Sequence, residues 1–238
     1  LDARYQDRAP RLERNDAGRA VFYDSQWNDD VHHVLHVSAS DETEGYYEEY
    51  RGDTEKLGRA LAQGFAFQGE HMRYRGSARG EPSSHLPPSA FIAFIQNHDQ
   101  VGNRAKGERL NMLVSLGRAK IAVALVMTSP FVPLLFQGEE WAASTPFLYF
   151  TDHEPDLGKL VSEGRKKEFA AFGWKPEDVP DPQDKTTFER SRLNWDEVAE
   201  PEHAGMMGWY RELIALRRLA PGDFVSTDVK VDFSEESG

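Results

Sequence analysis

Residues 91–95 form an apolar run without helical period, and the run ends abruptly in a polar group that begins at Asn97. Short apolar runs bounded by turn signals are typical of buried strands, often in parallel sheets. A second apolar run, residues 132–136, is followed at once by Gln137-Gly138-Glu139-Glu140-Trp141. We therefore predict two buried parallel strands whose carboxyl ends both carry polar side chains.

Apolar residues between these two runs recur at helical spacing over 110–128, which predicts one long helix. A strand, a helix and a strand in this order predict a right-handed parallel crossover, a unit of an α/β barrel or an open α/β sheet. Further helices are predicted at 54–62, ended by Gly64, and at 203–219.

The remaining pattern is weaker. Residues 20–27 predict a strand, after which Asp29 or Asp30 is expected to cap a short helix. A short strand is expected at 65–67, and the stretch 73–88, rich in Gly, Ser, Pro and Arg, predicts a long exposed loop. Alternation over 224–233 predicts the first strands of an all-β part.

The net charge of −12 argues against non-specific nucleic-acid binding, which requires basic patches, and fits a protein that handles a neutral substrate. The chain has no cysteine, which excludes disulfides and thiolate metal sites. The longest apolar stretch, 121–136, is short and is broken by Pro130 and Pro133, so no membrane span is expected. The charged start shows no signal peptide, and we expect a cytoplasmic protein.

Asn97-His98-Asp99 is the first candidate for chemistry. A carboxylate and an imidazole at a strand end can stabilise an oxocarbenium-like transition state and hold sugar hydroxyls. The alternative is structural, because Asp99 could simply cap the helix that follows. The local pattern alone leaves both interpretations open.

Histidines and glutamates give weaker candidates. His32 and His36 share a helix face, but no third ligand accompanies them, so we expect no metal site. Glu139 and Glu140 could act as acid and base, although pairing with Arg104 or Arg109 is the favoured interpretation. No phosphate loop, dinucleotide fingerprint or nucleophile elbow is present, and no cofactor is implied.

Several aromatic residues lie in predicted loops, where they could stack on sugar rings or serve ordinary packing. These residues are Trp27, Tyr46, Tyr47, Trp141, Phe147, Tyr149 and Phe150.

Four stretches together resemble the maltooligosyltrehalose trehalohydrolase branch of the α-amylase superfamily. They are QWNDDVHHVLHV, QNHDQVGNRAKGERL, SPFVPLLFQGEEWAASTPFLYFTDH and EGRKKEFAAFGW. The second resembles the superfamily's fourth signature region. The resemblance covers residues 12–219, nearly all of the chain.

The resemblance implies a (β/α)₈ barrel followed by a β-sandwich, with residues 1–220 as the second half of the barrel and 221–238 as the start of the sandwich. It also implies a retaining hydrolase that cuts the α-1,4 bond beside the trehalose end of maltooligosyltrehalose. Asp99 would stabilise the transition state, and His98 would bind the sugar. The residues expected to flank them or to shape the cleft are Asn97, Gln100, Trp27, Asp29, His32, Arg104 and Glu139.

One departure from the family pattern concerns its catalytic pair, an Asp nucleophile after the fourth strand and a Glu acid after the fifth. The first four strands have no counterpart, and Arg4 stands where the acid is expected. Retaining hydrolysis needs two carboxylates roughly 5 Å apart, which Asp99 alone cannot supply. The expectation is an incomplete enzyme that is inactive by itself.

Two alternatives stay open. The chain could be a non-catalytic remnant that only binds glucan. It could also resemble a branching-enzyme transferase, although the residues after Asp99 differ from the Glu-Val-Val-like run of those enzymes. A half barrel would leave strand edges unpaired, which predicts self-association.

Overall fold

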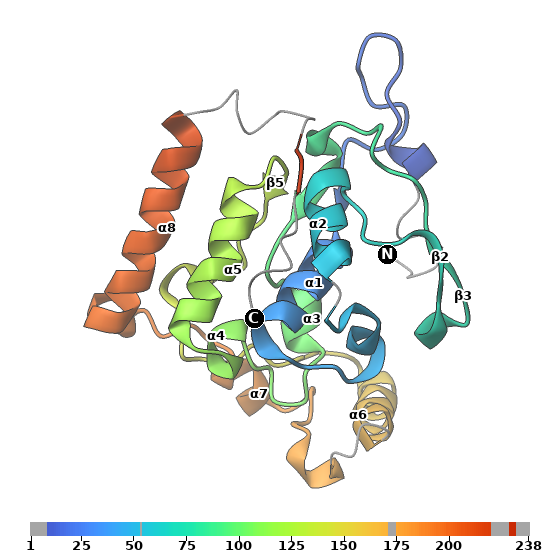
Figure 1. Ribbon diagram of the computed structural model, residues 1–238. Helices are drawn as coiled ribbons and strands as arrows, with labels where there is room; N and C mark the ends of the chain where they lie inside the picture. The colour runs from blue at the N-terminus through green and yellow to red at the C-terminus, as the bar shows by residue number, and fades with distance from the viewer. Residues whose placement is uncertain (1–8, 53, 171–174, 220–228, 232–238) are drawn as a thin grey trace. The chain divides into compact units, whose positions relative to one another are not determined.

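The computed structural model describes residues 9–52, 54–170, 175–219 and 229–231 (Figure 1). The chain forms two compact units. Unit 1 comprises Leu1–Ile95, Gly117–Leu134 and Arg211–Gly238, and unit 2 comprises Gln96–Leu116 and Leu135–Tyr210.

A parallel three-stranded sheet lies at the centre of unit 1, with strand order β1-β4-β5. The strands are β1 (Gln26–Trp27), β4 (Phe91–Ala93) and β5 (Val132–Pro133). Trp27 pairs with Ile92, and Ile92 pairs with Val132. The predicted α/β class with parallel strands is therefore confirmed. The strands are shorter than predicted, and Val132 is 42% exposed rather than buried.

Helix α1 (Asp29–Ser40) follows β1 directly. Asn28 caps it, because the Asn28 side chain accepts a hydrogen bond from the Val31 amide. The prediction that Asp29 or Asp30 is the cap is wrong. Helix α2 (Thr54–Gln63) ends at Gly64, as predicted, and the Gly64 amide donates to the Ala60 carbonyl at 3.0 Å.

An antiparallel hairpin occupies part of the stretch predicted as a long loop. It consists of β2 (Gln68–Met72) and β3 (Ser77–Gly80), joined across a short 3-10 helix, Arg73–Arg75. The strand predicted at residues 65–67 is wrong, because Phe65, Ala66 and Phe67 have no strand structure and β2 begins one residue later, at Gln68. These three side chains are fully buried or nearly so.

The core of unit 1 gathers around Phe91, whose ring contacts those of Phe65 and Phe131 edge-on. Helix α5 (Leu116–Thr128) buries Ala119, Val123 and the other residues of one face. The second half of α8 (Pro201–Leu219) runs beside it in Figure 1, and Arg217 donates hydrogen bonds to the carbonyls of Met127, Ser129 and Phe131.

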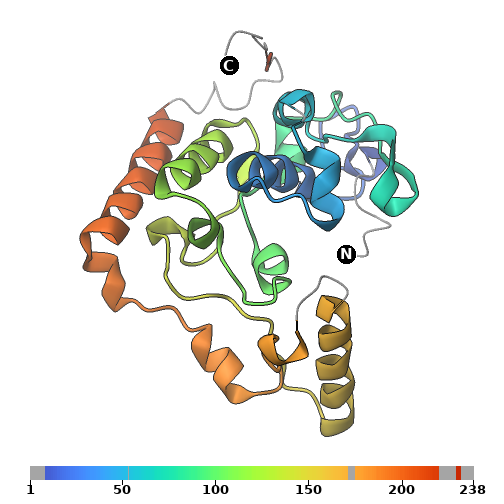
Figure 2. The same ribbon diagram turned by 60° about the horizontal axis from the view of Figure 1, so that its bottom comes forward.

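Unit 2 is built from helices and extended segments (Figure 2), with α6 on one side and the first half of α8 on the other. Its helices are α3 (His98–Gly102), α4 (Leu110–Leu113), α6 (Pro155–Ala170), α7 (Lys185–Arg190) and residues 201–210 of α8.

The prediction of a single helix over residues 110–128 is wrong in one respect. It is two helices, because the backbone at Val114 is extended (φ −129°) and ends α4.

The predicted β part at 221–238 falls almost wholly outside the described residues, and residues 229–231 carry no regular element. Within the described ranges, no helix combines the length and the apolar character needed to cross a membrane.

Candidate functional site

The polar group after β4 forms a reciprocal cap on α3. The Asn97 side chain accepts a hydrogen bond from the Asp99 amide at 2.8 Å, and the Gln100 side chain accepts one from the Asn97 amide at 2.9 Å. Such a pair satisfies two backbone donors that a helix start otherwise leaves open. Asn97, not Asp99, is therefore the capping residue, and the structural interpretation of Asp99 as the cap is wrong.

His98 and Asp99 are consequently left with exposed side chains on the first turn of α3. Their side chains are 54% and 62% exposed, and His98 Nε2 lies 3.4 Å from Asp99 Oδ1. Asn97, by contrast, is only 1% exposed. A buried amide thus fixes the backbone of the turn, and an imidazole and a carboxylate project outward from it together.

Gln96, the residue before this turn, is buried and contacts two other segments of unit 2. Its side-chain oxygen accepts a hydrogen bond from the Leu110 amide at 2.9 Å, and its nitrogen lies 3.3 Å from Glu139 Oε2. Tyr210 on α8 donates to Glu139 Oε1 at 3.1 Å. Burial raises the pKa of Glu139 to about 8, against the opposing effect of these two hydrogen bonds.

The two arginines predicted to pair with Glu139 or Glu140 make other contacts. Arg109 is fully buried and donates to the carbonyls of Thr145 and Gln137, both at 2.7 Å. Burial lowers the pKa of Arg109, and the neighbouring Glu139 carboxylate offsets this lowering only in part. Arg104 lies 3.4 Å from Glu108. The structure thus provides Arg109 as a neighbouring charge for Glu139.

Aromatic residues after the Glu139 turn pack near the end of α3. The Arg165 guanidinium lies 4.2 Å from the centre of the Tyr149 ring and donates to the Gly102 carbonyl at 3.0 Å. The Phe147 amide donates to the Gly107 carbonyl at 2.9 Å. Tyr149 and Phe150 keep 38% and 37% of their surfaces exposed. Part of this group therefore remains available for stacking.

Trp141 serves packing instead. It is buried, and its indole donates to Glu197 Oε1 at 3.1 Å. Ser144 donates to the same carboxylate through its amide and its hydroxyl. Burial raises the pKa of Glu197, but the hydrogen bonds from Ser144 outweigh burial and hold this pKa below its ordinary value.

The other three predicted site residues belong to unit 1. Trp27 ends β1 with 40% of its surface exposed, and its ring lies 6.1 Å from that of Phe94. Asp29 is half-buried at the start of α1. His32 is buried, with its ring nitrogens 2.7 Å from the Ile95 carbonyl and 3.0 Å from the Tyr47 hydroxyl.

The neighbouring histidines are also engaged in packing. His36 Nε2 lies 2.7 Å from Glu42, and the His36 ring stacks on Tyr47 at 4.5 Å. His33 Nδ1 lies 3.1 Å from the Tyr50 hydroxyl. The described part of the chain holds no group of three His, Cys, Asp or Glu side chains placed for a metal ion.

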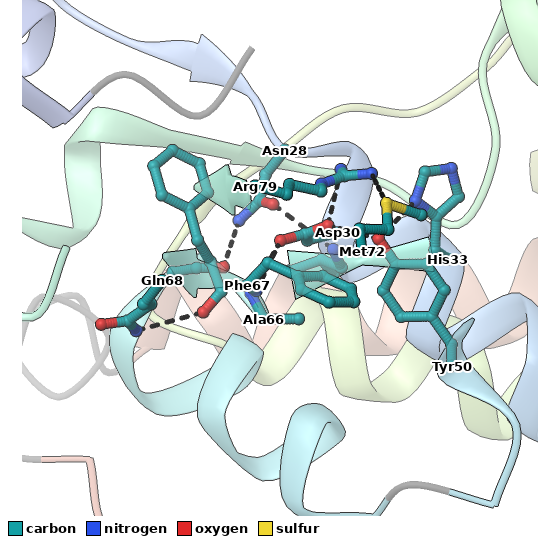
Figure 3. Close-up of polar contacts among 12 residues, drawn as sticks. Asn28, Asp30, His33, Tyr50, Ala66, Phe67, Gln68, Met72 and Arg79 are labelled. Carbon is teal, nitrogen blue, oxygen red and sulfur yellow. Dashed lines mark hydrogen bonds and ion pairs between the residues drawn. The ribbon is translucent and has the colours of Figure 1, made fainter. Parts of the chain in front are cut away.

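Sequence reasoning missed the buried acid Asp30, which Figure 3 shows at the centre of a polar network. Asp30 Oδ1 accepts from Tyr50 at 2.6 Å and forms an ion pair with Arg79 at 2.7 Å. Its other oxygen accepts from the amides of Ala66 and Phe67 at 2.8 and 3.1 Å. The acid joins the start of α1 to the β2–β3 hairpin. Side chains from Asp30 to Val37 are buried with it, which the sequence alone does not indicate.

The predicted site residues therefore form two groups. Asn97, His98, Asp99 and Gln100 share one helical turn, and Glu139 is connected to that turn through Gln96. Arg104 lies just beyond α3 in the same unit. Trp27, Asp29 and His32 follow one another along β1 and α1 of unit 1.

No family model matches the chain, but curated proteins that share one name are similar to it. The malto-oligosyltrehalose trehalohydrolase of Deinococcus radiodurans is 49% identical over 203 residues, which are 83% of this chain and 34% of that protein. The enzyme of the same name from Brevibacterium helvolum is 45% identical over 218 residues, 90% of this chain and 37% of that protein.

A solved crystal structure is also similar to this chain. It is provisionally described as an alpha amylase from Salmonella typhimurium, and it matches 90% of this chain with 45% identity and a TM-score of 0.84. The match covers 37% of that protein. The chain thus spans little more than a third of the length of these relatives. Over about nine tenths of its own length, this chain is homologous to the malto-oligosyltrehalose trehalohydrolases.

Proposed function

We propose that this chain forms part of a glycoside hydrolase of the α-amylase superfamily that acts on a trehalose-capped α-1,4-glucan. The observation that carries the proposal is the exposed His98–Asp99 pair, held outward on a capped turn directly after a parallel strand. The carboxyl ends of parallel strands are the usual place of catalytic groups in α/β barrels. The names of the relatives give the substrate class.

Asp99 would stabilise positive charge on the sugar ring in the transition state. A carboxylate placed where an oxocarbenium ion develops lowers the barrier without any covalent step. His98, 3.4 Å away on the same turn, would donate a hydrogen bond to a sugar hydroxyl. Tyr149 and Phe150, which are partly exposed, would offer part of a stacking surface in the same unit.

Hydrolysis with retention requires a nucleophile and an acid in addition to Asp99. The family resemblance assigns the nucleophile to the fourth strand, which has no counterpart among residues 1–238, and it aligns Arg4 with the acid. We therefore infer that this chain alone binds glucan but does not hydrolyse it.

We also infer that β1, β4 and β5 are neighbouring strands of a (β/α)₈ barrel, with residues 1–220 as its second half and 221–238 as the start of a β-sandwich. Support comes from the parallel order β1-β4-β5, in which strands neighbour one another in chain order. Consecutive strands of such a barrel are adjacent and joined by right-handed crossovers.

A chimera tests the catalytic assignment. Residues 12–219 would replace the matching stretch of the Deinococcus radiodurans enzyme, and trehalose release from maltooligosyltrehalose would be measured. We expect an active chimera that loses at least about 10²-fold in kcat when it carries Asp99→Asn, because one preorganised charge is removed.

Asp178→Asn is the matched control, since Asp178 is another exposed carboxylate of unit 2 and should leave activity unchanged. An Asp99→Asn chimera as active as the control would refute the role of Asp99. The isolated chain should also bind maltohexaose in a calorimetric titration without producing glucose or trehalose.

A further inference from the structure

Glu139 is a buried carboxyl at which three segments of unit 2 meet. It is 3% exposed and sits on the turn after residue 136. Gln96 reaches Oε2 from the segment before α3, and Tyr210 reaches Oε1 from α8. A carboxyl group this deeply buried cannot line an open cleft. Both of its oxygens accept hydrogen bonds from side chains of the same unit.

The Gln96 contact leads directly to the exposed turn. Gln96 is also 3% exposed, and its two side-chain polar atoms have different partners: the oxygen accepts from the Leu110 amide and the nitrogen donates to Glu139. The next residue along the chain is Asn97, the cap of α3. Fixing both ends of the Gln96 amide therefore fixes the backbone that enters the turn of His98 and Asp99.

We propose that Glu139 is a positioning residue, which holds the Gln96 side chain and through it the backbone of the Asn97–Asp99 turn, and which does not contact the substrate. This inference rests on the proposed function for its catalytic consequence. Its structural part, the link from Glu139 to the turn, can be tested without any sugar.

The charged and titratable groups that face Glu139 are Arg109, Glu140 and Tyr210. In the protonated state, the Glu139 hydroxyl can donate to the Tyr210 oxygen. In the ionised state, the Tyr210 hydroxyl donates instead. Gln96 can donate to Oε2 in either state, so the link should survive ionisation while its strength changes.

Amide hydrogen exchange in the isotopically labelled 238-residue chain tests the link. The reporters are the amides of Leu110 and Asn97, which donate to the Gln96 and Gln100 side chains respectively. In Glu139→Ala, we expect exchange at Leu110 and Asn97 to accelerate about tenfold, because Gln96 loses one of its two anchors. Glu139→Gln should rescue protection, since a carboxamide can accept from Gln96 and donate to Tyr210.

Glu140→Ala is the matched control. Glu140 lies on the same turn and accepts from the Gly138 amide at 2.8 Å, without contact to Gln96. If Glu139→Ala loosens the Leu110 and Asn97 amides no more than Glu140→Ala does, the proposal is overturned.

A titration keeps the proposal testable if Glu139→Ala fails to fold. The side-chain amide protons of Gln96 should shift with a midpoint near the Glu139 pKa of about 8 in the wild type, and not in Glu139→Gln. A Gln96 side-chain amide signal that does not shift between pH 6 and pH 10 in the wild type would overturn the link.

In the active chimera, Glu139→Gln should keep kcat, while Glu139→Ala should lower kcat more than it raises KM. A chimera without activity would sink the proposed function and leave the exchange result standing.

Discussion

At the scale of single residues, the buried Asp30–Arg79 pair carries the clearest stability prediction. Both side chains are almost completely buried, and Asp30 also accepts from Tyr50 and two backbone amides. Removal of one partner leaves the other as an uncompensated buried charge. We expect Arg79→Ala to lower the free energy of unfolding by about 3–5 kcal/mol, measured by urea denaturation.

Arg118 provides the comparison for this prediction. It pairs with Asp41 at 2.9 Å in the same unit, but the two side chains are 55% and 79% exposed. Exposed pairs contribute about 0–1 kcal/mol, so Arg118→Ala should have a small effect. Equal losses for Arg79→Ala and Arg118→Ala would show that the Asp30 network is not a special stabilising centre.

His33 makes the stability of the chain depend on pH. Burial, followed by the positive charges of His32 and Arg79, holds the pKa of His33 well below its ordinary value. The folded state therefore binds fewer protons than the unfolded state below about pH 6.5. Stability from this group is complete above that pH and falls as the pH is lowered, by up to about 1.4 kcal/mol per pH unit.

The measurement is urea denaturation of the wild type and of His33→Asn at pH 7.5, 6 and 5. Asn can retain the contact to Tyr50 without taking up a proton. Glu139 acts with the opposite sign, because its raised pKa favours the folded state below its ordinary pKa and less so as the pH rises toward about 8. Both proteins contain Glu139, so subtracting their free energies of unfolding at each pH removes the contribution of Glu139. The same pH slope in both would contradict the assignment to His33.

At the scale of elements, Gly64 decides how α2 ends. Its φ is +95°, and a Cβ there would lie 2.3 Å from Phe91 Cζ. Phe91 cannot move away easily, because it is 1% exposed and packed against Phe65 and Phe131. We expect Gly64→Ala to cost about 3 kcal/mol or more, from backbone strain and overpacking together.

Gly76→Ala isolates the strain. Gly76 has φ +64°, but a Cβ there would meet no atom within 4 Å. The expected cost is about 1 kcal/mol, from the left-handed backbone alone. Thermal or urea unfolding of both variants measures the difference. Similar losses would mean that the Phe91 contact relaxes freely.

The elements that sequence reasoning located correctly have a strong local cause. The helix at 54–63 shows amphipathic spacing and a terminal glycine, and β4 is an apolar run with turn signals on both sides. The break at Val114 was missed because the apolar pattern continues through it into α5, although Ser115 directly before α5 is a residue type that often precedes a helix. The hairpin at 68–80 was missed because its residues are mostly polar and exposed, so no alternation marks its strands.

The candidate site divides in the same way. Asn97 to Gln100 could be predicted, because a polar group after an apolar run is visible in the sequence. The network of Asp30 with Arg79 could not, since 49 positions separate the two residues and only the folded chain joins them. The roles of Gln96 and Tyr210 around Glu139 depend likewise on contacts between distant segments.

At the scale of the whole molecule, the parallel sheet predicts self-association. Among the described residues, the sheet has edges at β1 and β5, where Trp27 and Val132 are 40% and 42% exposed. Exposed edges present backbone groups that can pair with another chain. The net charge of −12 opposes this contact, so association should strengthen when salt screens the repulsion.

Sedimentation velocity over a range of protein concentrations, at low and at high salt, measures this effect. We expect oligomers that increase with concentration and salt, and that Val132→Lys suppresses by placing a charge on the β5 edge. Ile121→Lys is the control, because Ile121 is also apolar and 64% exposed but lies on α5. If Ile121→Lys reduces association as much as Val132→Lys, the contact is hydrophobic and non-specific. A monomer at every concentration and salt would show that charge repulsion outweighs the open edges.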